Sequence, residues 1–223
     1  TLTATSTGGS IRLKGSSIIN NGTVNPAGSL FFDTTTSISG TGNFTPYATL
    51  SVNANLTINS NHQFGGILLN AGSSFNMDNR VVGFSLSNPI TQNGTFSNAN
   101  SDIIYNGTVL QTVSTANINY VGLKINNPAG AILSNNITIP DTLAVILGDL
   151  NLNGKIITIT PVGYMTETPG NTVFGTTGYI TTTRNVGTPS SLNVGGLGAV
   201  LTASSNLGST EIKRGHTVQT GLN

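Results

Sequence analysis

The sequence contains no cysteine and no tryptophan, and only 7% of its 223 residues are charged. Without cysteine, the chain has no disulfides and no thiol or thiolate–metal chemistry. The formal net charge of +1 creates no strong field to attract a polyanion, so we expect no nucleic-acid partner. The longest apolar runs, such as Leu143 to Leu147, are far too short to cross a bilayer, and we expect no membrane insertion.

The polar residues are mainly asparagine, threonine and serine, which disfavour helix interiors because their short side chains compete for backbone hydrogen bonds. Apolar and polar residues alternate in many places, for example over 49–53, 55–59 and 149–153, and this period of two predicts half-buried strands. Asn-Gly pairs such as Asn21-Gly22 stand between these segments and predict turns. The sequence therefore predicts an all-β fold.

A short turn segment recurs before predicted strands, as Asn25-Pro26-Ala27-Gly28, Asn70-Ala71-Gly72 and Asn127-Pro128-Ala129-Gly130. Many short strands with frequent turns fit either a two-sheet sandwich or a solenoid, and these internal echoes favour a parallel β-helix or β-solenoid. Their unequal spacing indicates an irregular coil rather than a repeat with one fixed period. Scarce charge agrees with this fold, because like charges in a parallel stack would lie about 4.8 Å apart.

The pattern changes after Pro161, where longer segments over 178–184 and 198–203 are linked by glycine-rich turns. We predict a β-solenoid over residues 1–176 and the start of a β-sandwich-like element over 177–223. One edge of this element is expected to be exposed or paired with polypeptide outside the segment. The chain opens on Thr1 without the pattern of a leader peptide, so we expect a piece truncated from a larger parent.

Two stretches resemble the large cell-surface proteins that Bacteroidota export by the type IX secretion system. Residues 101–154, including 119–125 and 150–154, resemble the coils of their β-solenoid stalks, and residues 178–217 resemble the module that follows such stalks. The resemblance carries no catalytic residues. It implies a secreted, extracellular adhesin-like protein whose partners are the rest of the parent chain and the secretion or surface-attachment machinery.

The same resemblance implies candidate modification sites. Proteins of this group carry O-linked glycans on a hydroxyl that follows Asp when an apolar residue or Thr comes next. Asp33-Thr34-Thr35 and Asp141-Thr142-Leu143 match this pattern, so Thr34 and Thr142 are candidate O-glycosylation sites. Both acids stand at predicted turns, where a bulky polar adduct would face water.

Acidic residues are few and scattered singly along the chain. The nearest pair, Asp141 and Asp149, could meet across a turn, as the two carboxylates of a polysaccharide-cleaving β-helix enzyme would have to. His62 and His216 have no Cys, Asp or Glu nearby at ligand spacing, and no Gly-x-Ser-x-Gly sequence occurs. We therefore expect a structural stalk segment, not an enzyme, with no catalytic residue, cofactor or metal.

Two other functions remain open. A carbohydrate-binding module would take a glycan ligand on tyrosines that share an exposed face, from the set Tyr47, Tyr105, Tyr120, Tyr164 and Tyr179. A related ice-binding reading of Thr34–Thr36 and Thr181–Thr183 is weaker, because such threonine arrays need a regular repeat. An enzyme that cleaves polysaccharides would require two carboxylates to converge in a groove.

Overall fold

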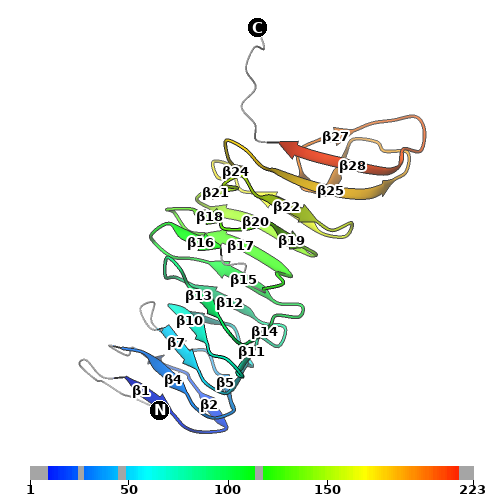
Figure 1. Ribbon diagram of the computed structural model, residues 1–223. Helices are drawn as coiled ribbons and strands as arrows, with labels where there is room; N and C mark the ends of the chain where they lie inside the picture. Colours follow the sequence, from blue (N-terminus) through cyan, green and yellow to red (C-terminus); the bar gives the residue numbers. More distant parts are fainter. Residues whose placement is uncertain (1–9, 25–27, 45–48, 114–117, 216–223) are drawn as a thin grey trace.

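The computed structural model describes residues 10–24, 28–44, 49–113 and 118–215, and these residues are almost entirely β. The chain coils into a parallel β-solenoid of about eight turns, in which each turn lies on the one before (Figure 1). The predicted all-β solenoid is confirmed.

Each turn of the N-terminal half contributes strands to three walls, and neighbouring strands in a wall come from successive turns. The first wall consists of β1 (Ile11–Leu13), β4 (Leu30–Phe32), β7 (Thr49–Val52), β10 (Gly66–Leu69) and β13 (Ile90–Gln92). The second wall consists of β2 (Ser17–Ile19), β5 (Thr36–Ser39), β8 (Asn55–Ile58), β11 (Ser74–Asn76) and β14 (Thr95–Ser97).

The third wall is the longest. It begins with the pair β3 (Thr23–Val24) and β6 (Asn43–Phe44), and β6 lies beside the next strand of the wall. That next part is one continuous sheet of β9 (His62–Phe64), β12 (Val81–Phe84), β15 (Asp102–Tyr105), β17 (Gly122–Asn126), β20 (Thr142–Leu147) and β23 (Tyr164–Glu167).

The first and second walls are interrupted, and new sheets take their places in the C-terminal half. The new first wall consists of β16 (Gln111–Val113), β18 (Ala131–Leu133), β21 (Leu150–Asn151) and β24 (Val173–Phe174). The new second wall consists of β19 (Ile137–Ile139), β22 (Ile156–Ile159), β25 (Tyr179–Val186) and β28 (Gly208–Gly215). Among the described strands, only the third wall joins the two halves by continuous pairing.

One turn takes close to 20 residues, although its length varies. In the first wall Leu30 pairs with Leu50, 20 residues on, whereas Leu50 pairs with Ile67 after 17 residues and Ile67 with Ile90 after 23. The paired strands of this wall remain aligned, and the difference in the number of residues per turn lies in the corners between strands. The expectation of an irregular coil agrees with this variation, but the mean period of about 20 was not recognised from the unevenly spaced turn segments.

The interior of the coil is filled by apolar side chains that stack on their equivalents one turn away. Phe44, Phe64 and Phe84 follow one another at 20-residue intervals, with ring centroids 5.3 Å and 6.3 Å apart. Their side chains point inward because period-two alternation places every second residue of a strand on the core face. Stacked rings and aliphatic chains thus form one continuous core along the molecule.

Two of the three recurring turn segments form turns that are closed by a hydrogen bond to the carbonyl of the leading asparagine, although the positive-φ glycine is the third residue of one turn and the fourth of the other. The N–H of Ser73 donates to the carbonyl of Asn70 at 3.1 Å, and the N–H of Gly130 donates to the carbonyl of Asn127 at 2.7 Å. Gly72 and Gly130 have φ values of 78° and 75°, a region that glycine enters without strain. Residues 25–27 of the third segment lie outside the described residues.

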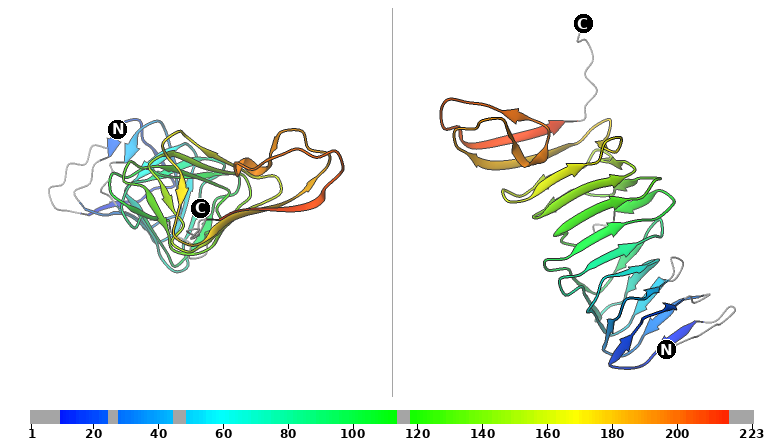
Figure 2. Two further views of the ribbon diagram at one scale, coloured as in Figure 1. Left: turned by 90° about the horizontal axis from the view of Figure 1, so that it is seen from above. Right: turned by 180° about the vertical axis from the view of Figure 1, so that it is seen from behind.

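The last part of the chain leaves the stack sideways (Figure 2). β25 begins in the coil, where Tyr179 pairs in parallel with Ile156, and then runs on as one arm of an antiparallel pair with β28. Between them, β26 (Leu192–Asn193) pairs antiparallel with β27 (Val200–Leu201), and a 3-10 turn, η1 (Val194–Gly196), lies against β23. The sequence predicts a boundary between the solenoid and the terminal element at residue 177. In the structure, β25 belongs to both parts, because it pairs with β22 of the coil and with β28.

Candidate functional site

The two carboxylates singled out for catalysis lie at opposite ends of one strand. Asp141 is exposed just before β20, and Asp149 follows that strand with its Oδ1 accepting the N–H of Thr172 at 2.7 Å. Because β20 has six residues, the two acids are about 20 Å apart at roughly 3.3 Å per residue. Paired carboxylates for glycoside hydrolysis need to be within roughly 10 Å. The predicted meeting of Asp141 and Asp149 across a turn is therefore wrong.

Most of the other acids are engaged with basic side chains. Asp102 lies 2.6 Å from Lys124, and Glu211 lies 3.3 Å from Lys213. Asp78 occupies a turn with a φ of 46°.

Asp33 belongs to a polar ladder that crosses four turns at one corner. Its two carboxylate oxygens accept hydrogen bonds from Asn53 at 2.7 Å and from Arg12 at 2.6 Å. Asn70 continues the ladder by donating to Asn53 Oδ1 at 2.6 Å. The bonds from Asn53 and Arg12 lower the pKa of Asp33, so this acid is held charged as a structural group.

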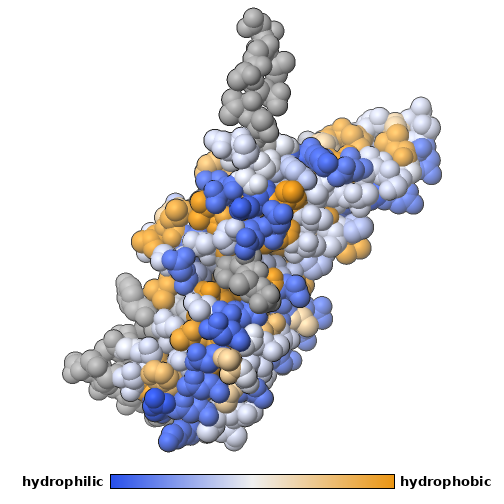
Figure 3. Space-filling model, viewed as in Figure 1, coloured by the Kyte–Doolittle hydropathy of each residue, from blue (hydrophilic) through white to orange (hydrophobic). Residues whose placement is uncertain are grey.

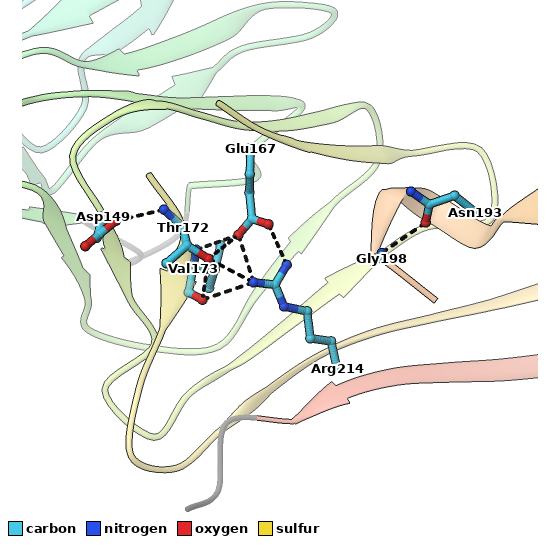
Figure 4. A network of polar contacts seen from close by, with 7 residues as sticks. All are labelled: Asp149, Glu167, Thr172, Val173, Asn193, Gly198 and Arg214. Atoms are coloured by element: carbon cyan, nitrogen blue, oxygen red, sulfur yellow. Dashed lines mark hydrogen bonds and ion pairs between the residues drawn. The ribbon is translucent and has the colours of Figure 1, made fainter. Parts of the chain in front are cut away.

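Glu167 and Arg214 form the most extensive polar network of the described residues (Figure 4). The Arg214 guanidinium donates to both carboxylate oxygens of Glu167, at 2.7 and 2.9 Å, and to Thr172 Oγ1 at 2.9 Å. Partial burial favours a higher pKa for Glu167, but the hydrogen bonds from Arg214, Val173 and Thr172 and the charge of Arg214 lower it. This network ties β28 to β23 and thereby fixes the terminal strands on the last turn.

His62 is a core residue. It is 3% exposed, its Nδ1 lies 3.1 Å from the carbonyl of Gly42, and its Nε2 lies 2.9 Å from Ser60 Oγ. Burial lowers the pKa of His62 below its ordinary 6.5, although the bond to Gly42 acts in the opposite direction. The imidazole ring also packs edge-on against Phe44, with centroids 5.6 Å apart. His216 lies outside the described residues.

The tyrosines do not share a face. Tyr105 and Tyr120 are buried in the core, where their hydroxyl oxygens lie 2.6 Å apart and where burial raises the pKa of Tyr120 well above 10.0. Tyr179 stands on β25 under Lys213, whereas Tyr164 stands on β23 in another wall and is 43% exposed. Tyr47 lies outside the described residues. A shared stacking platform, as considered from the sequence, is not formed by the described tyrosines.

Neither threonine run presents a flat row on one strand face: Thr181–Thr183 alternate between the two faces of β25, and only Thr36 of the first run lies in a strand. Thr182 is fully buried while Thr183 is exposed, and Thr36 is buried while Thr34 and Thr35 are exposed. This arrangement does not match an ice-binding array.

The two candidate glycosylation sites lie at the surface to different degrees. Thr34 is exposed at a corner, and its Oγ1 accepts the N–H of Gly15 at 3.3 Å. Thr142 is half-buried as the first residue of β20. Neither hydroxyl lies in the core, so the structure leaves the prediction standing without testing it.

Exposed apolar side chains gather beside the C-terminal first wall, where Figure 3 shows patches of hydrophobic surface. Leu110, Leu147 and Phe174 are about half exposed and line a groove of about 490 Å³ together with Asp149 and Asn151. No pattern in the sequence indicates this surface, because its residues come from three different turns.

Within the described ranges, no group of three or more His, Cys, Asp or Glu side chains is placed to hold a metal ion. The described helical structure is limited to the three residues of η1, and no described helix has the length and apolarity of a membrane span. Comparison of the chain with known protein families, with curated proteins and with solved structures finds no significant match.

Proposed function

We propose that this chain is a rigid structural segment in the stalk of a secreted, adhesin-like bacterial surface protein, and that it is not an enzyme. The observation that supports this most directly is the continuous apolar core, along which about eight turns are joined by parallel strand pairing. At roughly 4.8 Å per turn, the stack spans about 40 Å. A hydrogen-bonded coil with a packed interior resists bending, as a spacer must.

The distribution of acids also favours a scaffold over a polysaccharide-cleaving enzyme. Asp102, Glu167 and Glu211 form ion pairs, and Asp149 accepts a backbone N–H. The contacts of Asp102, Glu167 and Asp149 join neighbouring turns or strands, whereas Glu211 pairs within its own strand β28. The type IX secretion route, the cell-surface location and the attachment to a larger parent rest on the sequence resemblance of residues 101–154 and 178–217.

Labelling of intact cells tests the location. Antibodies raised against the purified segment should label intact cells of the producing bacterium. Protease added to intact cells should cleave the parent chain, and the same antibodies detect its loss. Labelling only after the cells are broken would contradict the proposal.

Replacement of the segment tests the structural role. A parent chain in which this segment is exchanged for an unrelated β-solenoid of equal length should keep adhesion, while deletion of the segment should weaken it. If the exchange abolishes adhesion as fully as the deletion does, the segment has a specific role of its own and the spacer proposal is wrong.

Incubation with acidic and neutral polysaccharides, with and without calcium, tests the enzymatic alternative. We expect no turnover. Turnover that disappears in Asp141→Asn or Asp149→Asn would overturn the structural proposal.

A further inference from the structure

A recess lies where the segment between β25 and β28 folds back onto the last turn of the coil. It has a volume of about 530 Å³, and its lining includes Tyr164, Arg184, Asn185 and Asn193. These residues come from β23, β25 and β26, so the recess exists only because the terminal strands dock on the solenoid. It lies on a different wall from the apolar groove around Leu110.

Arg184 is held rigidly at this recess without a counterion. Its Nε donates to Thr182 Oγ1 at 3.1 Å, and its Nη2 donates to the carbonyls of Thr160 and Gly163. The four ion pairs of the described residues do not include Arg184, and its Nη1 has no hydrogen-bond partner among those residues. A fixed guanidinium with free donors is a binding group for a carboxylate.

An exposed aromatic ring borders the same recess. Tyr164 is 43% exposed, and a side-chain carbon at Gly196 would lie 2.9 Å from its Cε1. Glycine at this position, with a φ of 75°, lets η1 approach the edge of the ring. The remaining face is available for an apolar or sugar surface, because a tyrosine ring offers a flat, polarizable contact.

An amide completes the set. Asn193 uses its Oδ1 to accept the N–H of Gly198 at 3.0 Å, which leaves its NH₂ group free to donate to a sugar hydroxyl. Asn185 follows Arg184 in β25, so its side chain projects from the opposite face of the strand. An aromatic ring, an amide and one cation around a shallow recess match the surface of a sugar that bears a carboxylate.

We propose that this recess binds an acidic saccharide, with the carboxylate of a hexuronate residue on Arg184, a pyranose face on Tyr164 and a ring hydroxyl on Asn193. The site would give the end of the stalk a ligand-binding function in addition to the spacer role. An acidic peptide could also engage the guanidinium, but a flat ring with an amide donor beside it favours a sugar.

Calorimetric titration with a short oligogalacturonate tests the proposal, and a neutral galacto-oligosaccharide of the same length and an oligoglutamate peptide serve as comparisons. We expect binding of the oligogalacturonate alone, weakened by added salt. Binding of the neutral sugar with equal affinity, binding of the peptide instead, or no binding of the oligogalacturonate would each overturn it.

Variants locate the site. Tyr164→Ala should weaken oligogalacturonate binding by about tenfold or more, and Tyr179→Ala, which alters another surface tyrosine outside the recess, should leave it unchanged. Arg184 also holds the last turn together, so its substitution affects folding as well as binding. Asn193→Asp avoids this difficulty, because the carboxylate keeps an oxygen that accepts the N–H of Gly198 and replaces the free NH₂ group with negative charge.

Asn193→Asp should weaken binding more than Asn185→Asp does, because Asn185 lies on the opposite face of β25, with thermal unfolding unchanged in both. Equal affinities for Tyr164→Ala and the unmodified protein, or tighter binding by Asn193→Asp, would show that the saccharide does not bind here.

Discussion

A single buried histidine makes the stability of this protein depend on pH near neutrality. The pKa of His62 is lowered in the folded state, so between its unfolded value near 6.5 and its lower folded value the unfolded chain binds more protons. Stability is therefore full above about pH 6.5 and falls as the pH decreases through that window, by up to about 1.4 kcal/mol per pH unit. The pKa values of Asp33 and Glu167 are lowered in the folded state, so their contributions to stability are lost only when the pH falls below their ordinary pKa values of 3.8 and 4.5.

We predict that the free energy of unfolding, measured by urea titration, decreases from pH 7 towards pH 5 and that His62→Gln removes most of this decrease. An identical pH dependence in the variant would show that His62 is not its source.

Glycines at equivalent corners of successive turns are not equally replaceable. A side-chain carbon at Gly42 would lie 2.1 Å from the carbonyl oxygen of Gly22, whereas a carbon at Gly22 would meet nothing within 4 Å. We predict that Gly42→Ala destabilises the protein by about 1–3 kcal/mol in chemical denaturation, because backbone must move to make room. Gly22→Ala is the matched control and should be close to neutral; a similar loss in both variants would mean that packing between turns is not the cause.

O-glycosylation of Thr34 and Thr142 remains a prediction. We predict that protein isolated from its native host carries glycans on Thr34 and Thr142, and that Thr34→Val and Thr142→Val each remove one of them in an intact-mass measurement. Thr34 is fully accessible and Thr142 only partly so, so occupancy should be higher at Thr34. A mass equal to that of the bare polypeptide would exclude both sites.

At the scale of elements, one ion pair holds the terminal strands on the solenoid. Arg214 of β28 reaches Glu167 of β23 through two hydrogen bonds, and both side chains are about one-quarter exposed. We predict that Arg214→Ala lowers the free energy of opening of β28, measured by hydrogen exchange, by about 1–3 kcal/mol while protection of β17 and β20 is retained. Lys213→Ala is the matched control, since among the described residues the one ion pair of Lys213 is with Glu211 of its own exposed strand and its ring contact is with Tyr179 of the neighbouring β25, so it makes no contact with the solenoid strand β23 that Arg214 reaches.

Equal loss of protection in the two variants would contradict this assignment. β28 is also the edge of its sheet, and its charged residues Glu211, Lys213 and Arg214 make that edge a poor template for further strand pairing.

At the scale of the whole molecule, the two halves of the stack meet at a break. The first wall stops at β13, and β16 begins a new sheet, so strand pairing does not continue there. A buried amide network replaces it. Gln111 donates to the carbonyls of Phe84 and Leu86 at 2.9 Å, and its Oε1 accepts from Gly107 and Asn127 at 2.7 and 2.9 Å.

We predict that Gln111→Leu separates the unfolding of the two halves. Each buried group left without a partner costs about 1–3 kcal/mol, and the loss falls on the junction, where strand pairing continues in the third wall but not in the first. Hydrogen exchange should show β1–β14 and β16–β24 opening together in the unmodified protein and separately in the variant. Gln63→Leu, at an exposed position, is the control; retained coupling in Gln111→Leu would refute the role of the network.

The sequence by itself determined the strand and turn chemistry. Alternation over 49–53 and 55–59 predicted strands that the structure contains. Successive side chains of a strand point to opposite faces, so a half-buried strand can be recognised within a few residues of sequence. Asn70-Ala71-Gly72 and Asn127-Pro128-Ala129-Gly130 predicted turns for the same local reason. Even the period was present, in the 20-residue spacing of Phe44, Phe64 and Phe84, but turn segments at different corners concealed it.

Only the tertiary structure decided which turns lie against one another. Corners of different length change how many residues separate stacked neighbours, so contacts such as Glu167 with Arg214 and the recess shared by Tyr164 and Arg184 have no local signature. Asp141 and Asp149 are close in sequence but lie at the two ends of β20, because an extended strand and not a turn separates them. Stacking is determined by packing and hydrogen bonding between residues about 20 or more positions apart, and a pattern read within one strand contains none of that information.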